Sequence, residues 1–165
     1  MKLDRIVRSK PDWMSARLRR DTVRLRGNRT WKSQPVIDTV QVKLRDGITG
    51  VNVNQAMAAS WRLRGNKQKN RFVFGDQAGA ITKRKDSVID FGNDNVRDVF
   101  VFKNTVPGKP FNHAQRFTIK NFGREDRIVL RNIGQTFEFK DIRRDGSLPG
   151  VSPLNFQVTS FAELA

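Results

Sequence analysis

The chain has 165 residues, with 32 Lys or Arg against 16 Asp or Glu and a net charge of +16. This length suits one domain, or one domain with an extended arm. The absence of cysteine excludes disulfides, thiolate metal sites and cysteine nucleophiles. No apolar run approaches the roughly 18–20 residues that a membrane-spanning helix needs. With no secretory signal read at Met1, we expect a cytoplasmic protein, free or on the cytosolic face of a membrane-bound complex.

The positive charge is concentrated in the first half of the chain. Residues 1–85 contain 21 Lys or Arg and six Asp, whereas residues 86–165 contain eleven basic and ten acidic residues. Self-repulsion on this scale destabilises a compact monomer, and a partner of opposite sign relieves it. A net charge of about 2–8 already keeps a small domain soluble. The excess therefore favours docking on an acidic partner over a merely soluble basic surface.

Residues 1–35 are predicted to form a basic N-terminal arm. Pro11 suits the first turn of a helix and Ser9 its cap, which predicts a short helix over residues 12–25. The apolar stripe of that helix is irregular, and an isolated helix of this length is marginal in water. We therefore expect the arm to become ordered against a partner.

From residue 36 onward the pattern changes to short alternating runs, which predict a β-rich module over residues 36–165. Runs of four to six residues, punctuated by Gly, Asn and Asp, are typical of an all-β fold of the roll or sandwich type. One helical turn is expected over residues 56–59. The predicted strands are 36–44, 48–54, 61–66, 71–74, 87–91, 98–102, 116–119, 127–130, 136–139 and 155–158.

One sequence pattern occurs twice. Residues 23–29 read Val-Arg-Leu-Arg-Gly-Asn-Arg, and residues 61–67 read Trp-Arg-Leu-Arg-Gly-Asn-Lys. If the pattern is structural, each copy is a strand with Leu inward and Arg outward, ended by a Gly-Asn turn. That interpretation competes with the helix over residues 12–25. Two copies are weak evidence for a repeat architecture.

The segment 76–142 resembles the last turns and C-terminal cap of an RTX-type β-roll. The similarity is carried by Gly92-Asn93-Asp94-Asn95 with Asp98-Val99-Phe100-Val101-Phe102, then by Ile119-Lys120-Asn121-Phe122 with Glu125-Asp126-Arg127-Ile128-Val129-Leu130. The resemblance implies a roll scaffold of a kind found in bacterial, including cyanobacterial, proteins. Calcium is not expected, because the chain lacks tandem Gly-Gly-x-Gly-x-Asp turns and its basic flank opposes cations. The spaced acids Asp86, Asp90, Asp94 and Asp98 are interpreted as turn formers and as partners of Lys83-Arg84-Lys85.

The sequence gives little support for catalysis. His113 is the only histidine, and no serine or carboxylate pattern beside it suggests a triad. Phosphate-cradling glycine loops are absent from the sequence. We therefore expect no enzyme activity, cofactor, metal or small-molecule substrate.

Binding is better supported, because arginine dominates the basic residues of the first half and makes bidentate contacts to carboxylate or phosphate. We expect a structural linker or assembly protein that docks on a large acidic protein complex. Phycobilisome linker proteins, which are small, basic and cysteine-poor, are similar in charge. The alternative is a ribosome- or nucleoid-associated nucleic-acid-binding protein, with tryptophans stacking on bases. The predicted partner-binding residues are Arg8, Trp13, Arg17, Arg19, Arg20, Arg24, Arg26, Arg29, Trp31, Trp61, Arg62 and Arg64.

Overall fold

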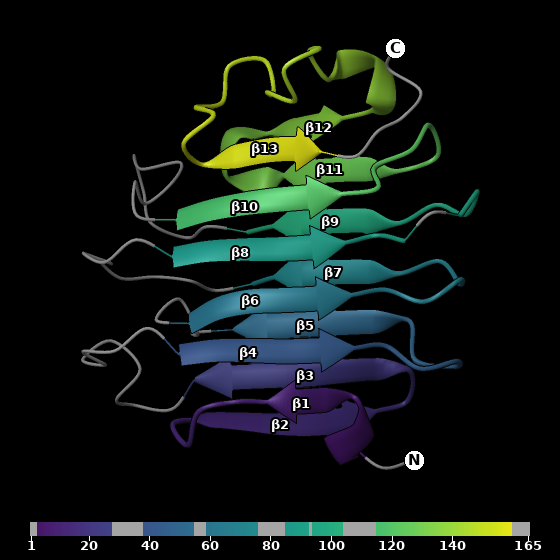
Figure 1. Cartoon of the computed structure of the whole chain (residues 1–165), viewed down its shortest axis with the longest axis vertical. Coiled ribbons are helices and arrows are strands. Elements are labelled where there is room, and N and C mark those ends of the chain that lie inside the picture. The colour runs from purple at the N-terminus through teal and green to yellow at the C-terminus, as the bar shows by residue number, and fades with distance from the viewer. Residues whose placement is uncertain are drawn as a thin grey trace.

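A computed structural model describes residues 3–27, 38–54, 59–75, 85–92, 94–103 and 115–159. Within these ranges the chain consists of β-strands and short 3-10 helices, which confirms the all-β class (Figure 1). The 3-10 helices are η1 (Leu3–Arg5), η3 (Arg131–Ile133) and η4 (Phe139–Asp141). The strands are β1 (Val7–Ser9), β2 (Met14–Arg19), β3 (Thr22–Gly27), β4 (Asp38–Lys43), β5 (Gly50–Asn54), β6 (Ala59–Arg64), β7 (Arg71–Phe74), β8 (Lys85–Asp90), β9 (Val99–Phe102), β10 (Gln115–Lys120), β11 (Arg127–Leu130), β12 (Gln135–Phe137) and β13 (Phe156–Thr159).

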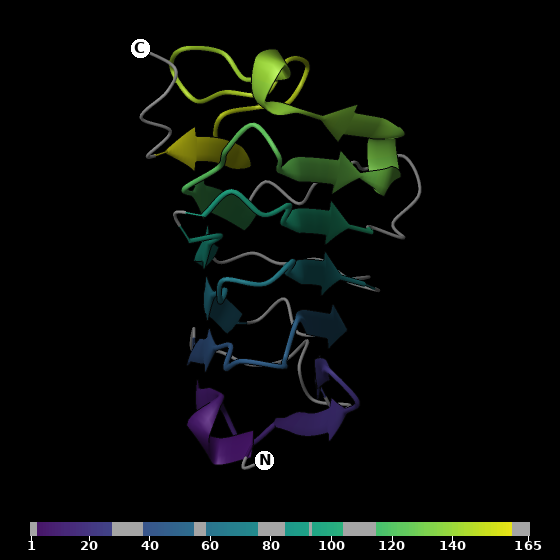
Figure 2. The same cartoon turned by 90° about the vertical axis from the view of Figure 1, so that its right-hand side faces the viewer.

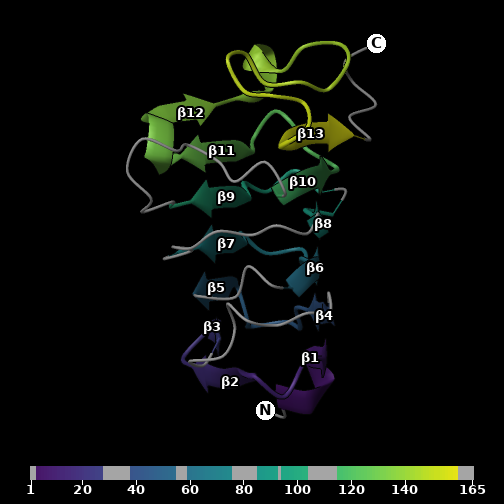
Figure 3. The same cartoon turned by 90° about the vertical axis from the view of Figure 1, so that its left-hand side faces the viewer.

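The strands form two sheets that lie face to face, as Figures 2 and 3 show. Sheet A has the order β1-β4-β6-β8-β10-β13, and sheet B has the order β12-β11-β9-β7-β5-β3-β2. From β3 to β11 the chain alternates between the sheets, and each strand pairs in parallel with the next strand of its own sheet. One passage through both sheets is called a coil below.

The core lies between the two sheets and is built from aligned columns of inward side chains. In sheet B the register aligns Val23, Val51, Phe72, Phe100 and Ile128, all of them buried. Alternation along each strand turns every second side chain outward. Phenylalanine rings fill the C-terminal half of the core, with centroids 5.0–5.6 Å apart among Phe74, Phe100, Phe102 and Phe117. Large rings and matched registers hold the coils in a fixed stack.

The structure does not confirm the extended N-terminal arm or the helix over residues 12–25. β1 pairs with β4 at the edge of sheet A, and β2 and β3 form an antiparallel hairpin in sheet B. Val23 and Leu25 are buried while Arg24 and Arg26 are exposed, as the competing strand interpretation predicted. Residues on both sides of the expected boundary at 35/36 contribute to one hydrophobic core. The boundary itself lies outside the described residues.

Most of the other predicted strands are confirmed to within one or two residues. Residue 59 opens β6, and the rest of the expected helical turn over 56–59 lies outside the described ranges, as does His113. The strand predicted over 136–139 ends at Phe137, because Phe139 begins the 3-10 helix η4. Asp90 and Asp94 form turns by accepting hydrogen bonds from the N–H of Gly92 and Val96, which confirms the turn interpretation for these two residues. Asp86 instead lies within β8, and Asp98 is fully buried and accepts the N–H of Asn70.

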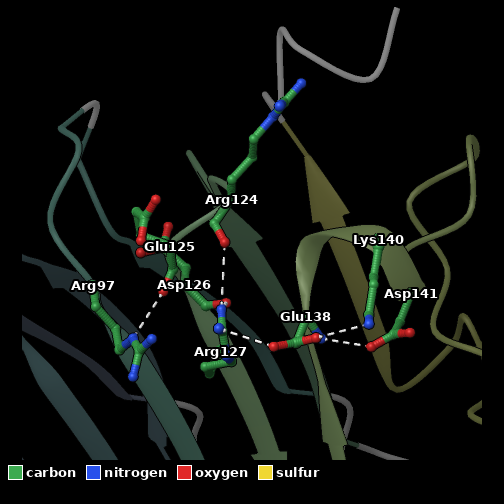
Figure 4. Close-up of polar contacts among 8 residues, drawn as sticks. All are labelled: Arg97, Arg124, Glu125, Asp126, Arg127, Glu138, Lys140 and Asp141. Atoms are coloured by element: carbon green, nitrogen blue, oxygen red, sulfur yellow. Dashed lines mark hydrogen bonds and ion pairs between the residues drawn. The ribbon is translucent and has the colours of Figure 1, made fainter.

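The C-terminal end of the stack is closed by a cap over residues 131–155. Arg127, on β11, forms an ion pair with Glu138 at 2.9 Å, and Glu138 also pairs with Lys140 at 3.4 Å (Figure 4). At the free edge of β13 the N–H of Val158 donates to the carbonyl of Gly146 at 2.8 Å. The cap therefore occupies a hydrogen-bonding position that a further strand would need.

Candidate docking surface

A densely basic surface lies on the outer face of the β2–β3 hairpin. Four exposed arginines point outward there, and we call them the arginine quartet: Arg17, Arg19, Arg24 and Arg26. The hairpin register sets Arg17 directly opposite Arg24. In the next strand, β5, Asn52 and Asn54 stand beside Arg24 and Arg26. The outward rows of β2, β3 and β5 contain no acidic residue.

The quartet is not neutralised within the described part of the chain. No described side chain forms an ion pair with any of the four guanidinium groups. Like charges placed directly opposite one another on a sheet are destabilising. The hairpin thus carries a repulsion that an external anion would relieve.

The closest acid in sequence, Asp21, serves the hairpin turn instead. Its carboxylate accepts hydrogen bonds from the hydroxyl of Thr49 at 2.7 Å and from that of Thr22 at 3.1 Å. The bond from Thr49, followed by that from Thr22, holds the pKa of Asp21 below its usual value. Asp21 therefore stays charged, with its oxygens directed to the turn between coils.

A second basic surface, the sheet A patch, lies on the outer face of sheet A. It surrounds a shallow hollow with a volume of about 310 Å³. The Arg62 guanidinium is anchored on the carbonyls of Trp61 and Asp86, at 3.0 and 2.8 Å. The acid in this patch, Asp90, accepts hydrogen bonds from the N–H of Gly92 and the side chain of Asn121. The basic residues of the patch are Arg8, Lys43, Arg62, Arg64 and Lys120.

The structure separates the predicted partner-binding residues into distinct places. The quartet lies on sheet B, Arg20 lies in the hairpin turn, and Arg8, Arg62 and Arg64 lie on sheet A. Arg29 and Trp31 are outside the described residues. The interpretation of two tryptophans as surface anchors is corrected, because the exposed fractions of Trp13 and Trp61 are 7% and 1%. Both side chains belong to the hydrophobic core.

Sequence reasoning missed Lys43 and Lys120. A signal was available, since both residues end alternating runs in which their apolar neighbours point inward. Sequence reasoning also missed a polar ladder at the turns that lead from sheet A to sheet B. It was not recognisable, because the ladder depends on which turns stack together.

The polar ladder joins consecutive coils through residues that directly precede sheet B strands. The carboxylate of Asp98 accepts the N–H of Asn70 at 2.8 Å, and that of Asp126 accepts the N–H of Asp98 at 2.8 Å. Each donor and acceptor are 28 residues apart, as are Asp21 and Thr49 in the first coils. The ladder thus fixes the height of one coil above the next.

Burial raises the pKa of both ladder carboxyls. The pKa of Asp98 rises to about 8 and that of Asp126 to about 6, because the fold removes each group from water and the neighbouring acids add repulsion. Asp98 also has a buried Oδ2 atom without a hydrogen-bond partner. Among the described residues, no three acidic or imidazole groups converge closely enough to hold a metal ion. We interpret the ladder as structural.

No family model matches the chain, and neither a curated protein nor a solved structure matches it significantly. In the part of the chain that the structure describes, no helix is both long enough and apolar enough to cross a membrane.

Proposed function

We propose that the chain is a non-enzymatic linker or assembly protein whose basic N-terminal coils dock on a large acidic protein complex. The observation that carries the proposal is the quartet, in which Arg17 stands directly opposite Arg24 without a neutralising acid. Such an arrangement costs folding stability. A partner that presents carboxylates would offset that cost, and guanidinium groups bind carboxylates in bidentate geometry.

The rest of the fold supports a rigid scaffold that presents this surface. Stacked coils with a phenylalanine core hold the hairpin against β5 in a fixed register. We propose a roll-type scaffold, in keeping with the RTX-like sequence, and a cytoplasmic setting. A phycobilisome-type antenna, with its acidic subunits, is the kind of complex that fits. The buried carboxyls of Asp98 and Asp126 serve coil stacking, which supports a non-enzymatic role.

Nucleic acid is the competing partner, and the positions of the two described tryptophans weigh against it. Binding of single strands relies on aromatic platforms for base stacking. Trp13 and Trp61 are buried, and the outward rows of β2, β3 and β5 offer Ser, Thr, Asn and Arg instead. On these described rows, a nucleic acid would be held by phosphate contacts. An acidic protein surface therefore fits the quartet better.

Affinity capture from an extract, with nuclease added to half of the sample, tests the proposal. We expect acidic proteins to stay bound after nuclease and to be released by high salt. The double variant Arg17→Glu/Arg24→Glu should reduce capture at least tenfold. The charge-matched control is Arg143→Glu/Arg144→Glu, at two exposed positions of the cap, and it should retain most of the capture. Loss of the captured material on nuclease treatment would instead establish a nucleic-acid partner.

A further inference from the structure

β2 is the terminal strand of sheet B, and its hydrogen-bonding edge is directed away from the stack. Figures 1 and 3 show it at the N-terminal end of the stack, across from β1 of the other sheet. It has six residues, compared with three in β1, three in β12 and four in β13, which are the other terminal strands. Long unpaired edges invite another strand. Among the described elements, β3 is the one that pairs with β2.

The register determines which backbone groups face that edge. The carbonyl of Asp21 accepts from the N–H of Thr49 at 2.8 Å, on the β5 side of the hairpin. Backbone groups alternate sides along a strand, so Val23 and Leu25 face β5, whereas Arg24 and Arg26 face β2.

The same alternation applies to β2 itself. Arg17 and Ser15, opposite Arg24 and Arg26, direct their backbone groups toward β3. The N–H and C=O groups of Ala16 and Leu18 consequently point to the free edge. The backbone groups of Met14 already have partners. Its N–H donates to the carbonyl of Pro11, and its carbonyl accepts a hydrogen bond from the side chain of Lys10. The available edge is therefore centred on Ala16 and Leu18.

The inward side chains of β2 are also incompletely covered. Ala16 and Leu18 point inward but are only partly buried, whereas Val23 and Leu25 on the neighbouring strand are 0% and 1% exposed. A further strand would cover the two partly buried residues. On the outward face, the same strand would lie beside Arg17 and Arg19.

We propose that β2 accepts an extended acidic segment of the partner as an additional strand of sheet B. Alternate carboxylates of that segment would face the quartet, and alternate apolar side chains would cover Ala16 and Leu18. Main-chain hydrogen bonds supply affinity in this mode of recognition, and alternate side chains supply specificity. The inference rests on the proposed acidic protein partner and specifies how that partner is bound.

Charge and backbone chemistry favour an acidic strand over two other possible occupants of the edge, a second copy of the chain and a nucleic acid. A second copy of the chain pairing through β2 would bring two sets of quartet arginines together, and like charges across strands are destabilising. A nucleic acid would contact the quartet through phosphates but has no peptide groups to pair with Ala16 and Leu18. The acidic strand is the occupant that satisfies both the edge and the face.

The test uses the full chain and a synthetic peptide of alternating Glu and Val. A control peptide of the same composition places the glutamates in one block and the valines in another. We expect the alternating peptide to bind at least tenfold more tightly by calorimetry at low salt. Amide hydrogen exchange should show new protection at Ala16 and Leu18, whereas the amides of Arg17 and Arg19 are already protected by β3. The exchange measurement requires no substitution.

The matched variants are Ala16→Pro, which removes an N–H from the free edge, and Ala16→Val, which keeps it. Proline is tolerated on an edge strand when its missing N–H would face solvent. We expect Ala16→Pro to weaken the alternating peptide at least tenfold and Ala16→Val to leave binding unchanged.

The outcomes separate this inference from the proposed function. Unchanged exchange at Ala16 and Leu18, or equal binding of both peptides, overturns strand addition. If Arg17→Glu/Arg24→Glu still abolishes capture of acidic proteins, docking through the quartet stands without it. If that double variant captures as well as the parent chain, both proposals fail. Self-association through β2, measured by sedimentation without peptide, would also overturn the inference.

Discussion

Replacing Asp98 by Asn should make the stability of this protein less dependent on pH. Asp98 is fully buried, its Oδ1 accepts the N–H of Asn70, and its Oδ2 has no partner. Burial, reinforced by the nearby charges of Asp126 and Asp94, raises its pKa from 3.8 to about 8. Between these two values the folded protein holds a proton that the unfolded chain has released.

The sign follows from that difference in bound protons. Stabilisation by a carboxyl with a raised pKa is complete below pH 3.8 and is lost as the pH rises through about 8. Three pH units at about 1.4 kcal/mol each set an upper limit of about 4 kcal/mol between pH 5 and pH 8. Relaxation and water around a buried group reduce this, so we expect about 2 kcal/mol.

The assay is urea unfolding of the parent chain, Asp98→Asn and Asp46→Asn at several pH values from 5 to 8. The Asn amide places donors at the site of the buried Oδ2, so Asp98→Asn carries a cost that does not vary with pH. The free energy of unfolding of Asp98→Asn relative to the parent should rise by about 2 kcal/mol across the range. Asp46→Asn removes an exposed carboxylate and controls for net charge. A constant difference between Asp98→Asn and the parent would refute the reasoning.

Four further substitutions test the cap, the turns and the quartet by chemical unfolding. Gly146→Ala should cost more than 2 kcal/mol, because φ is +85° and a Cβ would collide with the carbonyl of Val158. Gly134→Ala should cost about 1 kcal/mol, because φ is +67° but a Cβ there would meet open space. Equal losses of stability in the two glycine variants would contradict the argument that packing against Val158 adds to the cost at Gly146. Asn66→Ala should lower the free energy of unfolding by about 2–3 kcal/mol, because the Asn66 amide donates to the carbonyls of Arg45 and Ile48 at 2.8 Å. A change under 0.5 kcal/mol would show that solvent replaces these bonds. Arg24→Glu should raise stability by about 0.5–1 kcal/mol through a new pair with Arg17 while weakening partner capture, and a loss of stability would contradict the repulsion.

Much of the strand pattern could be predicted because alternation is local. Trp61 and Leu63 alternate with Arg62 and Arg64, and the structure buries the first pair and exposes the second. The same alternation could have placed Trp61 in the core, but its position among arginines suggested a surface anchor. Burial depends on which face meets the other sheet, and a single strand does not reveal that.

The N-terminal hairpin was harder to predict, because its residues suit two structures. Arginine and leucine favour helices, and Pro11 suggested a helix start. Met14, Ala16 and Leu18 also alternate with polar residues, and pairing with β3 decides in favour of the strand. The ladder from Asn70 to Asp98 and Asp126 required knowledge of coil stacking, which joins positions 28 residues apart.

The two kinds of connection between the sheets differ in how their length is constrained. Between β3 and β11, the connections from sheet A to sheet B contain six residues at 44–49, 65–70 and 121–126, and eight at 91–98. Those from sheet B to sheet A contain ten, four, ten and twelve residues, at 28–37, 55–58, 75–84 and 103–114. Strand registers are maintained across this threefold range, and added loop length costs little entropy. Fluorescent tags or affinity sequences inserted into the longer connections should therefore leave the strand pairing intact, which gives a practical way to label the protein without touching β2.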